Sequence, residues 1–455
     1  MPPQFEPTFE SLNRHEVPEW FHDAKFGIFI HWTMSCIPAF VPKSGSLPEL
    51  VRDHPNDMMK YNPYAEWYWN TMKFPDSAAA RYHRETYGDA PYEDFRQPYE
   101  AGLDAWDPKG LVDVIEASGA RYVVLVTKHH DGFVLWPTSV PNPHLPGWNS
   151  RRDVVGDLAE AVRGRGMRFG VYYSGGLDWT FNRDPIVNGI EMMASVPRTP
   201  EYRAYADAHF RELIARYEPS VLWNDIAYPP GPELPKLFAD YYNAIPDGLV
   251  NDRWAQPGSA LFPRPEHIDF RTPEYAQYDQ IRERKWEATR GIGHSFGYAA
   301  NEDPATIVSP EGLVHSFVDA VSKNGNLLLN IGPKPDGSVV PAHEVPLRAI
   351  GTWLARYGEA VHGTRPWLRA EGRATDAAST EFGVRFTKKG ERVFAIVLGT
   401  PVEGAMRLTG LEDLAVGGVS IVGGEALGFE RPGEALVLEV PRLAESQAHA
   451  FELRP

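Results

Sequence analysis

The feature that most constrains the fold is an alternation, repeated over about residues 20–360, of short β-rich apolar runs with helical patterns. Most runs are continuously apolar, as expected for parallel strands buried on both faces. Amphipathic helices are predicted in several of the intervening segments, over residues 151–166, 201–217 and 311–325. This order predicts an α/β fold, an irregular TIM-like (β/α)8 barrel. The eight predicted strands cover residues 26–32, 121–130, 167–174, 220–225, 248–253, 267–272, 293–298 and 326–333.

Two features modify this plan. Only 13 residues separate Arg253 from His267, which is too few for a full crossover helix, so the barrel cannot be regular. After about residue 362 the helical stripes stop, and short strands with Gly-rich turns follow. We therefore expect a barrel domain over residues 1–362 and a small C-terminal β-sandwich domain over residues 363–455. The long segment 33–66 follows the first strand and is expected to cover the catalytic mouth.

Charge and composition exclude several classes of function. The formal net charge is −16, so a nucleic-acid partner would be repelled. No polybasic run or long apolar stretch predicts membrane binding, and no secretory leader is visible, so we expect a cytoplasmic enzyme. The single cysteine, Cys36, forms neither a disulfide nor a cysteine metal cluster within the chain. A homo-oligomer is compatible with the sequence.

The predicted strand ends carry the chemistry. Reacting groups of barrel enzymes project from the C-terminal ends of the strands. Trp223 and Asp225 are two residues apart and face the same side of their strand, which suits a sugar ring stacked beside a carboxylate. Asp225 could equally cap the following turn. The other polar and aromatic groups at these ends are His31, His129, His130, Tyr172 and Arg253.

Alternatives remain open at several of these positions. His129 and His130 could bind a metal, although hydrogen bonding to hydroxyls is the stronger interpretation. Arg253 could hold a carboxylate ionised or form a structural ion pair. The residues alone do not identify a second catalytic carboxylate. Its candidates are Glu66, Glu266, Glu274 and Glu287.

Nine motifs, taken together, resemble the retaining α-L-fucosidases of glycoside hydrolase family 29. They occur in the family's order, cover roughly residues 17–335, and are far more specific together than singly. The motifs are KFGIFIHW, NPYAEWYW, TKHHDGF, GVYYSGGLDW, VLWNDIAYP, VNDRW, DFRTPEY, KWEATRGIGHSFGY and NLLLNIGPKPDG.

The resemblance implies an exo-acting enzyme that removes terminal α-L-fucose from fucosylated glycans through a covalent fucosyl-enzyme, without a metal or an organic cofactor. Asp225 matches the nucleophile and Glu274 the general acid/base. An apparent insertion over residues 255–266 makes Glu266 the reserve for the second role. The resemblance also implies that Phe29 and Phe296 line the pocket for the C6 methyl group. The groups that would hold the sugar are His31, Glu66, Trp67, His129, His130, Tyr172, Trp223 and Arg253.

Overall fold

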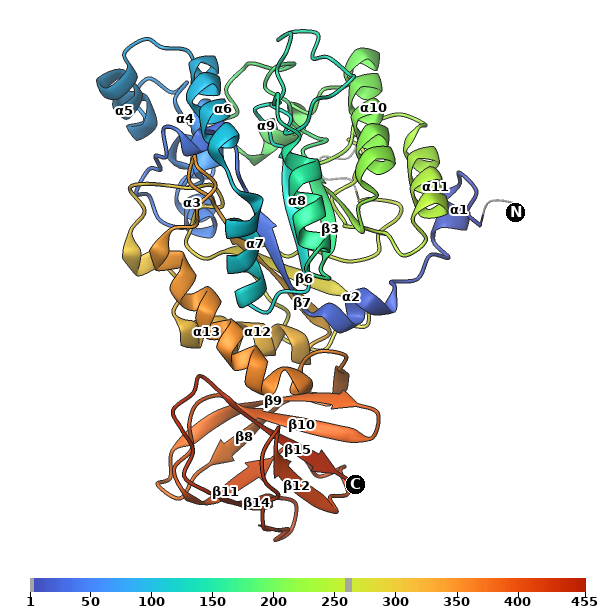
Figure 1. Ribbon diagram of the computed structural model, residues 1–455, viewed down its shortest axis with the longest axis vertical. Helices are drawn as coiled ribbons and strands as arrows, with labels where there is room; N and C mark the ends of the chain where they lie inside the picture. The colour runs from blue at the N-terminus through green and yellow to red at the C-terminus, as the bar shows by residue number, and fades with distance from the viewer. Residues whose placement is uncertain (1–3, 258–263) are drawn as a thin grey trace.

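The computed structural model describes residues 4–257 and 264–455, and its larger N-terminal part, up to about residue 360, is a curled parallel sheet surrounded by helices (Figure 1). The strand order is β5-β4-β3-β2-β1-β7-β6, and every neighbouring pair is parallel. The predicted TIM-like fold is confirmed. The strands are β1 (Phe26–Ile30), β2 (Tyr122–Lys128), β3 (Arg168–Tyr173), β4 (Val221–Asn224), β5 (Leu249–Val250), β6 (Trp286–Gly291) and β7 (Gly325–Ile331).

Side chains alternate between the inside of the barrel and the helices outside it. In β1, Phe29 joins an interior cluster with Tyr172 and Trp223, whereas Ile28 and Ile30 join the larger core under the helices. This alternation follows from the two-residue period of a strand. The covering helices are α7 (Pro108–Ala117), α8 (Val154–Arg163), α10 (Pro200–Tyr217), α11 (Leu234–Ala244), α12 (Pro310–Ser322) and α13 (Pro341–Tyr357).

The eighth barrel position differs from the prediction. Residues 293–298, predicted as a strand, form bends and irregular backbone. The strand before β7 is instead β6, whose sequence WEATRG resembles a helix. Residues 267–272 form no regular strand. They nevertheless fill the gap, because Asp269 N donates to Val250 O of β5 and Arg271 forms a bridge to Trp286 of β6. Of the predicted insertion over residues 255–266, positions 258–263 lie outside the described residues.

The segment over residues 33–66 is broken into short helices. It includes η1 (Met34–Cys36), where Cys36 is buried and burial raises the pKa of its thiol. No helix among the described residues is both long and apolar enough to cross a membrane. The remaining helices are α1 (Phe9–Leu12), α2 (Glu19–Ala24), α3 (Leu47–Asp53), η2 (Met58–Tyr61), η3 (Ala65–Trp67), α4 (Tyr68–Thr71), α5 (Ala78–Tyr87), η4 (Tyr92–Phe95), α6 (Arg96–Ala105), α9 (Gly189–Ala194), η5 (Pro304–Thr306) and η6 (Gly358–Ala360).

The C-terminal strands form one antiparallel sheet in the order β12-β15-β10-β9-β8-β11-β14-β13. Figure 1 shows this sheet folded back on itself and packed against α12 and α13. Across that contact, Arg385 Nε lies 2.5 Å from Asp319 Oδ1, and Trp353 Nε1 donates to Ala448 O. The strands are β8 (Arg365–Thr375), β9 (Glu381–Lys389), β10 (Arg392–Val397), β11 (Gly404–Thr409), β12 (Gly418–Ile421), β13 (Phe429–Glu430), β14 (Leu436–Val440) and β15 (His449–Arg454).

Candidate active site

A pocket of about 730 Å³, measured out to its open mouth, lies at the C-terminal ends of the parallel strands. That is the end at which barrel enzymes carry their reacting groups. The structure brings all twelve predicted site residues to its lining: Phe29, His31, Glu66, Trp67, His129, His130, Tyr172, Trp223, Asp225, Arg253, Glu274 and Phe296.

Asp225, directly after β4, is the most strongly held carboxylate in the pocket. Its Oδ1 accepts hydrogen bonds from Arg253 Nη1 at 2.8 Å and from the backbone N–H of Ile226 at 2.8 Å. Its Oδ2 accepts one from the Tyr172 hydroxyl at 2.7 Å. Burial alone would raise the pKa of Asp225, but the positive charge of Arg253 and the hydrogen bonds from Tyr172 and Arg253 outweigh it. The pKa therefore lies below its ordinary value, and Asp225 is ionised.

Arg253 binds the second carboxylate as well. Its Nη2 lies 3.1 Å from Glu274 Oε2, while Nη1 holds Asp225. The other oxygen of Glu274 accepts a hydrogen bond from the Tyr64 hydroxyl at 2.8 Å. One planar guanidinium thus fixes the relative position of the two acids, as only arginine can do through a rigid fork of donors.

The backbone after each of these acids is strained. Ile226, which follows Asp225, has φ of 64°, and Tyr275, which follows Glu274, has φ of 47°. A left-handed conformation costs a non-glycine residue of order 1–3 kcal/mol, and such strain concentrates at functional sites. In the first turn the strain is compensated by the hydrogen bond from Ile226 N–H to the carboxylate.

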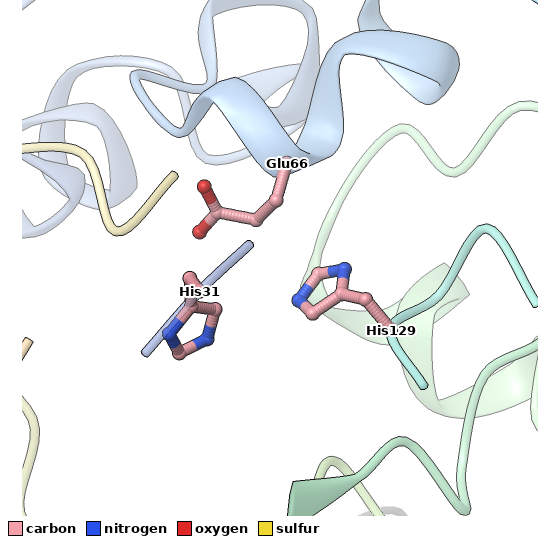
Figure 2. Close-up of side chains that lie close together, drawn as sticks. All are labelled: His31, Glu66 and His129. Atoms are coloured by element: carbon pink, nitrogen blue, oxygen red, sulfur yellow. The ribbon is translucent and has the colours of Figure 1, made fainter. Parts of the chain in front are cut away.

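Three side chains from separate segments converge deeper in the pocket (Figure 2). His31, Glu66 and His129 are all buried, and each offers a donor or acceptor atom within 4.8 Å of the others. His31 is oriented by a hydrogen bond from Nδ1 to the side chain of Asn330 at 2.6 Å. Glu66 Oε2 accepts the backbone N–H of Gly297.

Burial sets the charge of these three side chains and of the neighbouring His130. It lowers the pKa of His31 to about 4 and the pKa values of His129 and His130 well below the ordinary value, so all three imidazoles are neutral near pH 7. Burial also raises the pKa of Glu66 to about 7. Neutral imidazoles each offer one donor and one acceptor, which suits sugar hydroxyls. Two imidazoles and a carboxylate are also donor types that zinc accepts.

Aromatic rings form one wall of the pocket. The Trp223 and Tyr172 rings stack with their centroids 5.4 Å apart, and the centroid of the Phe29 ring lies 5.2 Å from that of Trp223. The Arg253 guanidinium lies over the Trp223 ring, 4.7 Å from its centroid. The ring centroids of Phe296 and His31 lie 5.0 Å apart. An apolar wall beside fixed polar groups is the usual composition of a site for a small polar ring.

The two remaining acidic candidates lie elsewhere. Glu266 is exposed and is absent from the described lining of the pocket, so the reserve assignment receives no support. Glu287 is buried inside the barrel on β6, which corrects the helical interpretation of its segment.

Sequence reasoning missed several residues of the lining. Tyr64 and Asn62 belong to the long 33–66 segment, whose predicted position over the mouth was the one available signal. Thr289 lies on β6, the strand that the sequence did not reveal. The other missed residues are Met58, Met59, Met192 and Ile226.

Two carboxylates held by one arginine, beside an aromatic wall and neutral imidazoles at the mouth of a TIM-like barrel, define a glycoside hydrolase. Comparison with known proteins gives the particular family. The sequence model of the family described as alpha-L-fucosidase matches residues 1–359. The chain belongs to the α-L-fucosidase family.

Relatives and solved structures agree with this assignment. The tissue α-L-fucosidase of Bos taurus is 32% identical over 90% of this chain and 80% of the relative. A Thermotoga maritima α-fucosidase, solved in complex with a mechanism-based inhibitor, is 41% identical with a TM-score of 0.88, covering 99% of this chain and 100% of that one. A Thermotoga maritima α-L-fucosynthase is 42% identical with a TM-score of 0.89 and the same coverage.

Proposed function

We propose that this α-L-fucosidase releases terminal α-L-fucose by a retaining double displacement, with Asp225 as the nucleophile and Glu274 as the general acid/base. The observation that carries the assignment is Arg253, which binds both carboxylates and leaves them facing one pocket. In retaining enzymes the two carboxyl groups lie about 5–5.5 Å apart, which leaves no space for a water molecule between the nucleophile and the sugar.

In the first step, Asp225 attacks the anomeric carbon while protonated Glu274 gives its proton to the glycosidic oxygen, and the bond between that carbon and oxygen breaks. Asp225 Oδ1 already accepts two hydrogen bonds, whereas Oδ2 accepts one, from Tyr172. A lone pair therefore remains free on Oδ2, and we assign the attack to that oxygen.

In the second step, Glu274 acts as the base. Esterification removes the negative charge of Asp225, and Glu274 is ionised after giving up its proton. It then takes a proton from water, whose oxygen attacks the anomeric carbon and releases Asp225 as a carboxylate. No metal or organic cofactor takes part in either step.

Sugar recognition follows from buried polar side chains. His31, Glu66 and His129 converge within 4.8 Å, so they can bind neighbouring hydroxyls. A sugar that lacks a matching hydroxyl would leave buried groups unpaired, and this penalty is the source of selectivity among sugars. Phe29 and Phe296 supply apolar surface for the C6 methyl group.

The test of the nucleophile is Asp225→Gly, assayed with 4-nitrophenyl α-L-fucoside. We expect turnover to fall by several orders of magnitude with the fold retained, because the covalent intermediate cannot form. Added azide should occupy the vacated space and restore a slow reaction that gives a fucosyl azide of inverted configuration. Near wild-type turnover without azide would show that Asp225 is not the nucleophile.

Two controls separate the rival interpretations. A metal-dependent hydrolase would lose activity on prolonged chelation, whereas we expect no loss for this enzyme. A fucose-binding protein would bind fucose but release nitrophenol from no fucoside. Release from the α-L-fucoside, and none from a β-D-galactoside run beside it, would exclude the binding protein.

We further propose that the enzyme acts in the cytoplasm on fucosylated glycans, without a nucleic-acid or membrane partner. The net charge of −16 and the single buried cysteine are compatible with this proposal. Subcellular fractionation tests the location, and light scattering of the purified enzyme tests for a homo-oligomer.

A further inference from the structure

Glu287 is a buried carboxyl group that the proposed mechanism does not use. It lies on β6 with its side chain inside the barrel, fully buried, and it does not belong to the described lining of the pocket. Burying a carboxyl group is costly unless it is hydrogen-bonded. Here the Tyr122 hydroxyl of β2 donates to Oε2, and the Trp223 indole N–H of β4 donates to Oε1 at 3.3 Å.

The bond to Trp223 links Glu287 to the active site. The Trp223 side chain has one polar atom, Nε1, and the acceptor of its N–H in the described structure is Glu287. The face of the indole meets the Arg253 guanidinium at 4.7 Å and stacks on the Tyr172 ring at 5.4 Å. Arg253 and Tyr172 in turn donate to the two oxygens of Asp225.

We infer that Glu287 is a positioning residue, which fixes the plane of the Trp223 indole so that Arg253 and Tyr172 aim Asp225 at the anomeric carbon. This inference rests on the proposed nucleophilic role of Asp225. The site requires an acceptor at Glu287, not a full negative charge. Burial raises the pKa of Glu287 to about 7, and both the ionised and the protonated carboxyl retain a lone pair for the indole N–H.

A purely structural role predicts a different pattern of effects. Glu287 makes one bond toward the site and one away from it, to Tyr122, so the two bonds can be removed separately. Tyr122→Phe removes the bond that does not involve Trp223. Glu287→Gln keeps an acceptor oxygen for Trp223, whereas Glu287→Leu has a similar size and no acceptor.

The experiment measures kcat, KM and thermal stability for these three variants with 4-nitrophenyl α-L-fucoside. We expect kcat of Glu287→Gln and Tyr122→Phe to remain within about three-fold of wild type. Glu287→Leu should lose about ten- to one hundred-fold in kcat, with a smaller change in KM, because displacement of reacting groups by a fraction of an ångström to one ångström costs rate on this scale. If Glu287→Leu does not fold, Glu287→Met replaces it.

A double-variant cycle tests whether the effect passes through Trp223. Trp223→Phe keeps an aromatic wall without the N–H donor, so in that background Glu287→Leu and Glu287→Gln should have equal kcat. An equal difference between them in both backgrounds would overturn the inference, and so would wild-type kcat in Glu287→Leu. Failure of the proposed function is distinguishable, because Asp225→Gly would then remain active or the wild-type enzyme would release no nitrophenol.

Discussion

Arg253 is the residue on which the geometry of both acids depends. Its guanidinium contacts Asp225 at 2.8 Å and Glu274 at 3.1 Å, and these two carboxylates raise its own pKa although burial acts in the opposite direction. Arg253 therefore stays charged at any pH at which the enzyme is folded. This charge keeps Asp225 ionised in a place where burial alone would favour its protonated form.

We predict that Arg253→Gln lowers kcat/KM by about one hundred-fold, since it removes a preorganised charge at the reacting centre. Its pH profile should change as well. Under the proposed mechanism, activity requires ionised Asp225, whose pKa lies below its ordinary value, so we expect the acid limb of kcat/KM in the wild type below about pH 4. Without Arg253, burial dominates, the pKa rises, and the acid limb moves to higher pH. An acid limb at the same pH in Arg253→Gln and wild type would contradict this account. Arg373→Gln, at an exposed position, is the control and should leave the pH profile unchanged.

For Glu274 we predict a dependence on the leaving group. Glu274→Ala should lower kcat/KM by about 10²–10⁴-fold for fucosides with poor leaving groups, which need protonation. Activated aryl fucosides should lose much less in the first step. Glu266→Ala, at the exposed reserve position, should change neither. Equal losses on both substrate types would count against the acid role of Glu274.

The pocket lining was largely predictable, whereas its cross-contacts were not. Residues at strand ends such as His31 and Asp225 are identified by their position and, together, by the resemblance of the motifs. The bond from Tyr64 to Glu274 joins residues 210 positions apart, and no local pattern indicates such a pair. The strain at Ile226 is equally invisible, because an isoleucine does not predict a left-handed conformation.

At the scale of elements, β6 was the strand that the sequence analysis did not predict. Its inward positions include Glu287, and its alternation of polar and apolar residues is too short to distinguish a strand from a helix. Residues 293–298 were predicted as that strand instead, and they form none. Residues 267–272, predicted as a further strand, do lie at the eighth position of the barrel, held by single bridges. Their irregularity follows from the short connection after Arg253, as the sequence indicated.

Gly332, directly after β7, packs closely against the segment that carries Phe296 of the pocket. A Cβ at Gly332 would lie 2.5 Å from Tyr298 N and 2.7 Å from Phe296 O, both backbone atoms. We predict that Gly332→Ala lowers the free energy of unfolding by about 1–3 kcal/mol and raises KM, because it displaces the segment that carries Phe296. Thermal melts and Michaelis curves measure both effects. Gly110→Ala, in α7 with open space around it, should be neutral or slightly stabilising; equal behaviour of the two variants would refute the steric argument.

At the scale of the whole molecule, the C-terminal sheet is attached through polar contacts as well as packing. Asp319 on α12 pairs with Arg385 from β9 and with Lys323, the residue directly after α12. The Tyr357 hydroxyl pairs with His449 of β15. We propose that the chain divides into domains over residues 1–362 and 363–455. Limited proteolysis near Gly363 tests this division.

We predict that Arg385→Met lowers the free energy of unfolding by about 2 kcal/mol, because it leaves a mostly buried Asp319 with one cation fewer. The kcat of the folded enzyme should not change, since neither residue lines the pocket. Urea unfolding and a fucoside assay give the two quantities. Arg407→Met, at an exposed position of the same sheet, is the matched control. Wild-type stability in Arg385→Met would show that the ion pair contributes nothing.

The buried Cys36 makes this enzyme suited to single-site labelling. The chain has one thiol, and in the folded protein it is both inaccessible and held in its unreactive protonated form by burial. A cysteine introduced at an exposed position such as Val402 would therefore be the sole reactive thiol under native conditions. A fluorophore or a solid support could be coupled there without first removing a native cysteine.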